Sequence, residues 1–337
     1  MSLLLSLVLA VATLLALVSQ EASAVTTFPF RPDGTFTIVQ IADVHYSSGS
    51  SKICLGIALE EMPCSDLNTT DFIARIMDGV TPDLVVFTGD NIQLTFNADN
   101  AIRKYSEPVI ARQIPWAMIF GNHDDEGNLD RQQMLDIVKT LPYAVSERGP
   151  LDVDGIGNYA LSVADGNTTL FNLFLLDSGA YSKVDGIGGY DWVKPSQIKW
   201  FLQTSQDLNA GLAAPNPALA FFHIPIPEYE QAVDKLGSEL EGVHDGDVNS
   251  GLFAAFLEAG DVKATFVGHD HINDYCGDHF GVKLCYGGGI GYGTYGRIGF
   301  KRRARIIKLE NFGKVVRTWK VLDDLALTQI DSQFLVQ

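Results

Sequence analysis

The stretch VKATFVGHDH, residues 262–271, joins the pattern of a buried strand to a run of polar side chains. A short, mostly apolar run that ends at a glycine is typical of a strand covered on both faces. His269 and His271 flank Asp270 directly after that strand. The same residue types occur in ordinary turns, so a functional role for the two histidines depends on partners elsewhere in the chain.

Five other stretches repeat this pattern of an apolar run that ends in Gly, Asp, Asn or His. They cover residues 36–45, 83–91, 116–124, 170–179 and 218–225. Helical spacing of apolar residues is found between them, over residues 69–80, 194–209 and 249–260. We expect Thr70 to cap the first of these helices and Pro195 to lie near the start of the second. The alternation of strands and helices predicts the α/β class.

The C-terminal stretch 303–324 predicts a closing hairpin, because the turn sequence Asn311-Phe312-Gly313 separates two alternating segments. The basic run KRRAR (301–305) opens this stretch. It would either steer anions or lie on an edge strand, where basic side chains discourage further pairing, and we favour the edge strand. No linker rich in Pro, Gly and Ser divides the chain, so residues 25–337 are expected to form one domain.

The composition excludes two classes of protein. Apolar residues make up 46% of the 337 residues and charged residues 19%, which is enough apolar material for a folded core rather than a disordered chain. The formal net charge is −17. A nucleic-acid-binding protein needs a basic face for the phosphate backbone, so no nucleic-acid partner is expected.

Residues 1–24 are interpreted as a signal peptide. An uncharged apolar run over 3–18 is followed by the small-x-small sequence Ala22-Ser23-Ala24, which predicts cleavage after Ala24. The alternative is an uncleaved anchor, although the run is shorter than a full span of about 20 residues. No later segment is long and apolar enough to cross a bilayer. We therefore expect a secreted protein, or one held in a cell-wall, extracellular or vacuolar compartment.

The cysteines and the glycosylation sequons fit that expectation. Four cysteines allow three pairings, and proximity favours Cys54–Cys64 and Cys276–Cys285 over free buried thiols. Disulfides of this kind form in oxidising compartments. Two Asn-x-Thr triplets begin at Asn68 and Asn167, which are the expected glycosylation sites.

Polar side chains collect where the predicted strands end, and ligands of open α/β sheets bind beyond the carboxyl ends of strands. The donors are Asp43, His45, Asp90, Asn122, His223, His269 and His271. Oxygen and imidazole donors without thiolates suit ions such as Fe, Mn, Zn or Mg. Seven donors are too many for one tetrahedral ion, and they fit two ions about 3.5–4 Å apart.

The motifs DVH (43–45), GDN (89–91), GNHD (121–124), a histidine after AFF (220–222) and GHDH (268–271) occur in this order. This series resembles the calcineurin-like metallophosphoesterases. Longer stretches, PDLVVFTGDN among them, resemble single-domain plant proteins described as probable inactive purple acid phosphatases, over about residues 36–310. The resemblance implies a four-layer α/β/β/α sandwich of two mixed sheets, with a dinuclear metal site at the C-terminal ends of strands.

The resemblance also implies roles for single residues. The metal ligands would be Asp43, His45 and His271 for the first ion, Asn122, His223 and His269 for the second, and Asp90 for both. His123 would face the substrate phosphate, with Asp124 holding its ring. Purple acid phosphatases have a metal-binding tyrosine where this chain has Gln93 and a glycine where it has His45. We therefore expect no tyrosinate–iron absorption band and two divalent or trivalent ions drawn from Fe, Mn or Zn.

The expected function is that of a secreted metal-dependent phosphoesterase acting on phosphomonoesters. A hydroxide between the metals would attack phosphorus in line, and His123 would assist the leaving group. A phosphodiesterase or nucleotide pyrophosphohydrolase on the same core is the first alternative. A secreted binding glycoprotein without catalytic activity is the second. The expected partner is a phosphorylated substrate.

Three further residues are candidates for contact with that substrate. Asn91 either touches the phosphate or caps a turn. His244 either lines the mouth of the cleft or is an exposed loop histidine, and the loop position is favoured. Tyr292, like Tyr295 in the same glycine-rich stretch, either stacks on a leaving group or packs in the ordinary way.

Overall fold

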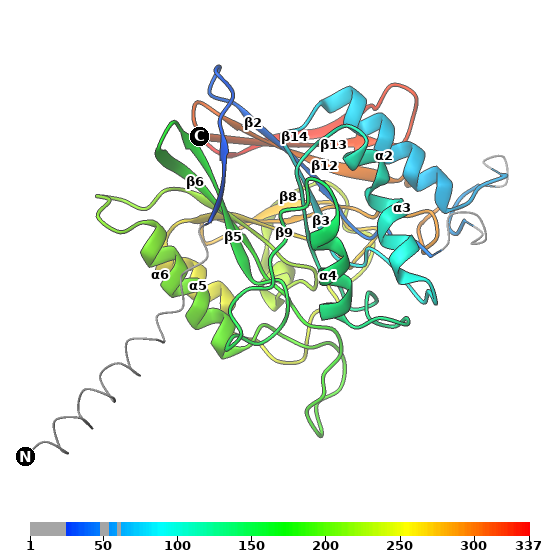
Figure 1. Cartoon of the computed structure of the whole chain (residues 1–337), viewed down its shortest axis with the longest axis horizontal. Coiled ribbons are helices and arrows are strands. Elements are labelled where there is room, and N and C mark those ends of the chain that lie inside the picture. Colours follow the sequence, from blue (N-terminus) through cyan, green and yellow to red (C-terminus); the bar gives the residue numbers. More distant parts are fainter. Residues whose placement is uncertain (1–24, 48–53, 59–61) are drawn as a thin grey trace, which may run out of the picture.

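Two β-sheets stack face to face and carry helices on both outer sides (Figure 1). The computed structural model describes residues 25–47, 54–58 and 62–337, so the expected signal peptide lies outside the described residues. Parallel and antiparallel pairs occur in both sheets. This is the α/β/β/α sandwich of two mixed sheets that the resemblance implied.

The larger sheet has eight strands and the smaller has six. In spatial order the larger sheet contains β1 (Thr26–Pro29), β5 (Tyr159–Asp165), β6 (Thr168–Leu175), β7 (Ala218–Phe221), β9 (Val262–Val267), β11 (Val282–Tyr286), β10 (Cys276–His279) and β8 (Val233–Leu236). The smaller sheet contains β14 (Gln329–Val336), β13 (Val315–Leu322), β12 (Arg303–Glu310), β2 (Phe36–Ile41), β3 (Leu84–Thr88) and β4 (Trp116–Ile119).

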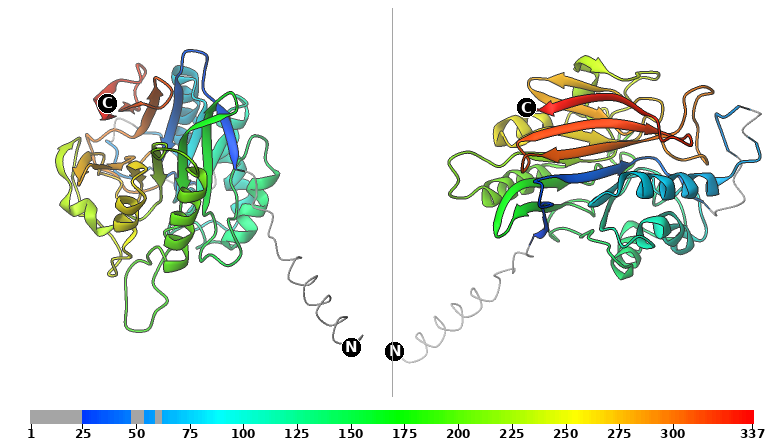
Figure 2. Two further views of the ribbon diagram at one scale, coloured as in Figure 1. Left: turned by 90° about the vertical axis from the view of Figure 1, so that its left-hand side faces the viewer. Right: turned by 90° about the horizontal axis from the view of Figure 1, so that it is seen from above.

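The helices divide between the two outer faces (Figures 1 and 2). Those against the smaller sheet are α2 (Asp66–Val80), α3 (Ala98–Ile110) and α4 (Arg131–Thr140). Those against the larger sheet are α5 (Pro195–Leu208) and α6 (Leu252–Ala259), and the short 3-10 helix η2 (Pro227–Gln231) follows β7.

Strand β3 shows how the layers fill the core. Leu84 and Val86 pack into the cluster between the sheets, whereas Val85 and Phe87 pack into the cluster under α2, α3 and α4. Side chains alternate between the two faces of a strand, and all five residues of β3 are buried. The continuous apolar runs of the sequence therefore predicted strands covered on both faces correctly.

The predicted elements are present, with one error at a boundary. All six expected strands and all three expected helices form, and the C-terminal hairpin is β12 and β13. However, α2 begins at Asp66 rather than after Thr70. Ser65 Oγ accepts from the backbone N–H of Leu67, and Asn68 Oδ1 accepts from that of Ser65, so Ser65 is the cap. The prediction missed α3 and α4, in which polar residues obscure the apolar spacing.

The basic run at 301–305 does not lie on an edge strand, so that prediction is wrong. Strand β12 lies between β13 and β2. Arg303 and Arg305 of β12 are buried and contact Asp274. Buried Lys320 of β13 contacts the same aspartate. Arg303 forms an ion pair with the Asp274 carboxylate, Lys320 Nζ lies 2.7 Å from Asp274 Oδ1, and Arg305 Nη2 donates to the Asp274 carbonyl over 2.7 Å. Burial opposes ionisation, but Lys320 and Arg303 hold the pKa of Asp274 below its ordinary value.

Both expected disulfides are present. Cys276 and Cys285 face each other across the antiparallel pair β10–β11, and Cys54 is bonded to Cys64. No helix in the described ranges, which leave out residues 1–24, is long and apolar enough to cross a membrane.

We predict that Asp274→Asn lowers the free energy of unfolding by about 3–5 kcal/mol, because it removes the ion-pair partner of buried Arg303 and leaves buried Lys320 paired with Asp331 alone. Urea unfolding followed by circular dichroism measures this change. The control is Asp278→Asn, whose partner Lys283 lies 3.0 Å away at a partly exposed site and which should cost at most about 1 kcal/mol. Equal losses in the two variants would contradict the structural role of Asp274.

Candidate metal centre

Seven buried donor side chains meet at the C-terminal ends of five strands from both sheets. Asp43 and His45 follow β2, Asp90 follows β3, Asn122 follows β4, His223 follows β7, and His269 and His271 follow β9. Residues separated by more than two hundred positions in the sequence are therefore neighbours in space. These are the seven residues that the motif series singled out.

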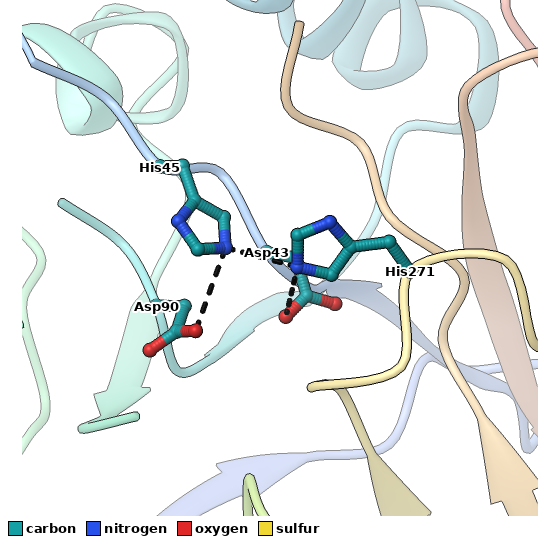
Figure 3. Close-up of side chains that lie close together, drawn as sticks. All are labelled: Asp43, His45, Asp90 and His271. Carbon is teal, nitrogen blue, oxygen red and sulfur yellow. Dashed lines mark hydrogen bonds and ion pairs between the residues drawn. The ribbon is translucent and has the colours of Figure 1, made fainter. Parts of the chain in front are cut away.

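The first group of donors is Asp43, His45, Asp90 and His271, whose ligand atoms all lie within 4.8 Å of one another (Figure 3). His45 Nε2 lies 3.0 Å from His271 Nε2 and 3.4 Å from Asp90 Oδ2. His271 Nε2 lies 3.7 Å from Asp43 Oδ1. Two imidazole nitrogens and two carboxylates that converge in this way could hold one metal ion.

The second group shares Asp90 with the first and adds His223 and His269. His223 Nε2 lies 3.2 Å from Asp90 Oδ2 and 3.2 Å from Asn122 Oδ1. Asp90 therefore stands between the two groups, where a ligand common to two ions would lie. Two overlapping donor groups suggest a dinuclear metal site.

The backbone turns sharply at the donor positions. Asp43, His45, Asp90 and His269 have φ values of 58°, 46°, 49° and 76°, in the left-handed region that side chains other than glycine rarely adopt. Such strain collects at functional sites and persists only where the surrounding structure imposes it. At Gly89 (φ +89°) an added Cβ would lie 2.5 Å from His223 Nδ1, which explains the glycine in the GDN motif.

Three donor histidines have an oxygen acceptor beside Nδ1. His45 Nδ1 lies 3.1 Å from Gln93 Oε1, His223 Nδ1 lies 2.9 Å from the carbonyl of Thr88, and His271 Nδ1 lies 3.1 Å from the carbonyl of Tyr295. Acceptors at these positions assign the hydrogen to Nδ1 and leave the Nε2 lone pair free for a metal. Gln93, which the sequence marked only as a departure from purple acid phosphatases, thus supports His45.

The charges around the donors fit a cationic ligand. Asp43 Oδ2 is buried and has no hydrogen-bond partner within the described residues. Burial raises the pKa of Asp43 to about 8, which shows how costly its negative charge is without a cation. Burial lowers the pKa of His271 to about 3, so its imidazole is neutral and able to bind a metal. Burial opposes protonation of His223, but Asp90 raises its pKa to about 9.

His123 stands at the mouth of this centre. Its ring centroid is 5.4 Å from that of His45, and about a quarter of its side chain is exposed. His123 Nδ1 lies 2.8 Å from Glu126 Oε1. The predicted partner, Asp124, is directed elsewhere: its carboxylate accepts from the backbone N–H groups of Gly121, Asn91 and Ile92. The expectation that Asp124 holds the His123 ring is therefore wrong, because convergent backbone donors draw that carboxylate inward.

The three candidates for substrate contact differ in their surroundings. Asn91 is buried and donates from Nδ2 to the carbonyl of Ile119, so it supports a turn. His244 is an exposed loop histidine, as the favoured interpretation expected, with 53% of its side chain exposed. Its Nδ1 lies 2.6 Å from Asp270 Oδ1, and its ring is 6.5 Å from that of His269. The Tyr292 hydroxyl donates to Asp323, away from the donors.

Three tyrosines that the motifs did not identify as part of the centre touch its residues. The ring of Tyr295, not that of Tyr292, stacks on His271 with centroids 3.9 Å apart. Tyr190 meets the ring of His269 edge-on at 4.4 Å. The hydroxyl of Tyr181 accepts from Asn122 Nδ2 over 3.2 Å. Tyr181 and Tyr190 come from the loop between β6 and α5, which carries no motif that would have revealed them.

The chain is similar to known proteins. The family model "Calcineurin-like phosphoesterase" matches residues 36–273. "Probable inactive purple acid phosphatase 29" of Arabidopsis thaliana is 42% identical, over 91% of this chain and 87% of that protein. "Phosphatase DCR2" of Saccharomyces cerevisiae is 38% identical over 86% of this chain, which spans about half (54%) of the yeast protein.

A solved structure has the same overall fold as this chain. A dimetal phosphatase from Danio rerio superposes with a TM-score of 0.61 at 14% identity, over 89% of this chain and 98% of the other. At that identity the likeness concerns the fold alone. The family model covers more than two thirds of the chain and includes all seven candidate metal donors. The chain belongs to the calcineurin-like phosphoesterase family.

Proposed function

We propose that this protein is a secreted phosphomonoesterase that uses two metal ions. The observation that carries the proposal is the pair of overlapping donor groups, which share Asp90. Asp43, His45 and His271 would bind the first ion, and Asn122, His223 and His269 the second. Such a pair of ions neutralises a phosphate ester and lowers the pKa of a water molecule near it.

The donor set supports iron, manganese or zinc, because imidazole and carboxylate ligands suit all three. Gln93 occupies the position of the tyrosine that colours purple acid phosphatases, and it contacts His45 Nδ1. An iron-loaded protein would then lack the tyrosinate band. The name of the Arabidopsis relative describes it as probably inactive, but this chain has a full set of candidate donors and a histidine beside them.

We propose that His123 donates a proton to the leaving group. Its ring lies beside the first donor group and is partly exposed, so a substrate can reach it. Glu126 Oε1 lies 2.8 Å from Nδ1, so a carboxylate stands directly beside this ring. A positioned proton donor lowers the barrier for departure of an alkoxide.

Passage through the secretory pathway is the second part of the proposal. Two disulfides suit an oxidising compartment. Asn167 is exposed in the turn between β5 and β6, which supports its use as a glycosylation site. Asn68 lies in the first turn of α2 and is the weaker candidate, because its Oδ1 caps the helix. Removal of residues 1–24 would leave a mature domain of residues 25–337.

We predict that Asp90→Asn removes bound metal and phosphatase activity together, because both donor groups lose their common carboxylate. Elemental analysis should find two ions in the wild type and fewer in the variant. The wild type should hydrolyse p-nitrophenyl phosphate in preference to bis-p-nitrophenyl phosphate. The control is His279→Ala, which changes a histidine that packs on Phe253, away from the donors. A preference for the diester would favour the phosphodiesterase, and two ions with no activity on either ester would favour the binding glycoprotein.

We predict that His123→Ala keeps both metal ions and lowers kcat about 10²- to 10⁴-fold, because the leaving oxygen loses its proton donor. The loss should be largest for alkyl phosphates, whose leaving groups are most basic. Steady-state kinetics and elemental analysis of the same preparation measure the two quantities. An unchanged kcat with an alkyl phosphate would refute this role of His123.

We predict that the protein secreted by a eukaryotic host begins at Val25 and carries N-linked glycan on Asn167. Mass spectrometry of the N-terminal peptide identifies the cleavage site. Asn167→Gln should remove one glycan from the intact mass. A mature chain that still starts at Met1 would contradict the cleaved signal peptide and support the anchor.

A further inference from the structure

Tyr181 links the metal centre to the substrate-facing histidine. It lies on the loop of residues 176–194 between β6 and α5, and its side chain is partly exposed. Its ring stacks on that of Tyr190 with centroids 5.6 Å apart, and Tyr190 in turn packs against His269. The backbone of this loop folds on itself, with an antiparallel bridge between Tyr181 and Tyr190.

The first contact of the Tyr181 hydroxyl is with Asn122. Asn122 Oδ1 faces the second donor group, 3.2 Å from His223 Nε2, and Nδ2 donates to the Tyr181 hydroxyl over 3.2 Å. A side-chain amide has one acceptor end and one donor end. A hydroxyl that accepts from Nδ2 therefore fixes the orientation in which the oxygen can bind a metal. With the amide reversed, an N–H group would point at the cation.

The second contact is with Glu126. Having accepted from Asn122, the Tyr181 hydroxyl directs its own hydrogen toward Glu126 Oε1, 3.5 Å away. The same carboxylate oxygen lies 2.8 Å from His123 Nδ1. The His123 ring also meets the Tyr181 ring edge-on at 6.5 Å. One hydroxyl thus contacts a candidate metal donor on one side and the carboxylate beside His123 on the other.

A buried arginine fixes the two loops that make these contacts. Arg131 Nη2 donates to the carbonyl of Gly121 over 2.7 Å and to that of Gly179 over 3.1 Å. Its Nη1 forms an ion pair with Asp177. Gly121 precedes Asn122, and Gly179 precedes Tyr181 by two residues. Arg131 therefore ties together the backbone next to Asn122 and the backbone two residues before Tyr181, which is itself 42% exposed.

We infer that Tyr181 is a positioning residue, which orients Asn122 toward the second metal and, through Glu126, holds His123 toward the leaving group. This inference rests on the proposed function for its kinetic part only. Its metal-binding part stands by itself, because it concerns the affinity of the second site whatever the substrate.

Tyr181→Phe tests the inference, because it removes the hydroxyl and keeps the ring contacts. Titration of the metal-free full chain with Mn²⁺ in a calorimeter should show the second ion bound about 10- to 100-fold more weakly, as is typical when a group behind a ligand is lost. The affinity of the first ion should stay unchanged. Tyr143→Phe is the matched control, since Tyr143 is an exposed tyrosine in the segment between α4 and β5.

A double-mutant cycle separates orientation from a general effect on folding. Asn122→Asp places an acceptor at both ends of the side chain, so no amide needs to be oriented. In that background Tyr181→Phe should change the second affinity by no more than about twofold. A full loss in both backgrounds, or a weakening of both ions, would show that Tyr181 only supports the structure and would overturn the inference.

Kinetics at saturating Mn²⁺ test the part that acts through Glu126. Tyr181→Phe and Glu126→Gln should lower kcat for phenyl phosphate more than for p-nitrophenyl phosphate, with KM nearly unchanged, because the poorer leaving group depends more on His123. Glu126→Gln should leave the second affinity as in the wild type. Metal affinities and kcat ratios equal to the wild type in Tyr181→Phe would overturn the inference. A wild type that binds metal as expected but hydrolyses neither ester would instead contradict the proposed function alone.

Discussion

The rest of the structure depends on the position of one buried carboxylate. Asp90 Oδ2 lies 3.4 Å from His45 Nε2 and 3.2 Å from His223 Nε2, and these two histidines come from different sheets. A carboxylate removed from water needs a cation or hydrogen-bond donors around it. Both contacts form only when the two sheets stack with the C-terminal ends of their strands together. The four-layer sandwich is the arrangement that brings β2, β3 and β4 of one sheet to β7 and β9 of the other.

Two kinds of buried charge serve different purposes in this fold. Asp274 is surrounded by the side chains of Arg303 and Lys320, so the protein itself balances its charge and joins β12 and β13 to the larger sheet. The ion pairs described for Asp43 and Asp90 are with histidines, which are charged only when protonated. That difference indicates that the charge of Asp274 has a structural role, whereas Asp43 and Asp90 are candidate ligands for a metal.

The surroundings of the donors explain why the tyrosine of purple acid phosphatases can be absent. Gln93 is uncharged and cannot replace a tyrosinate as a ligand. Its amide oxygen instead contacts His45 Nδ1, and His45 then supplies a nitrogen to the candidate centre. The carbonyls of Thr88 and Tyr295 act in the same way on His223 and His271. Backbone and amide oxygens thus orient three imidazoles of this chain with Nε2 available to the candidate centre.

The sequence by itself determined six strands, the C-terminal hairpin, the class of fold, the disulfide pairs and the positions of the seven candidate donors, because apolar runs that end in polar motifs encode strand and site together. It did not reveal strands β1, β5, β8, β10, β11 and β14. Only the tertiary structure decided which side chains stand behind the donors. Asp124 adjoins His123 in sequence, yet it turns inward to three backbone N–H groups, and Glu126 takes its place. Tyr181 reaches Asn122 from a loop without a motif. Side-chain direction and contacts between distant loops depend on packing, which a linear pattern does not record.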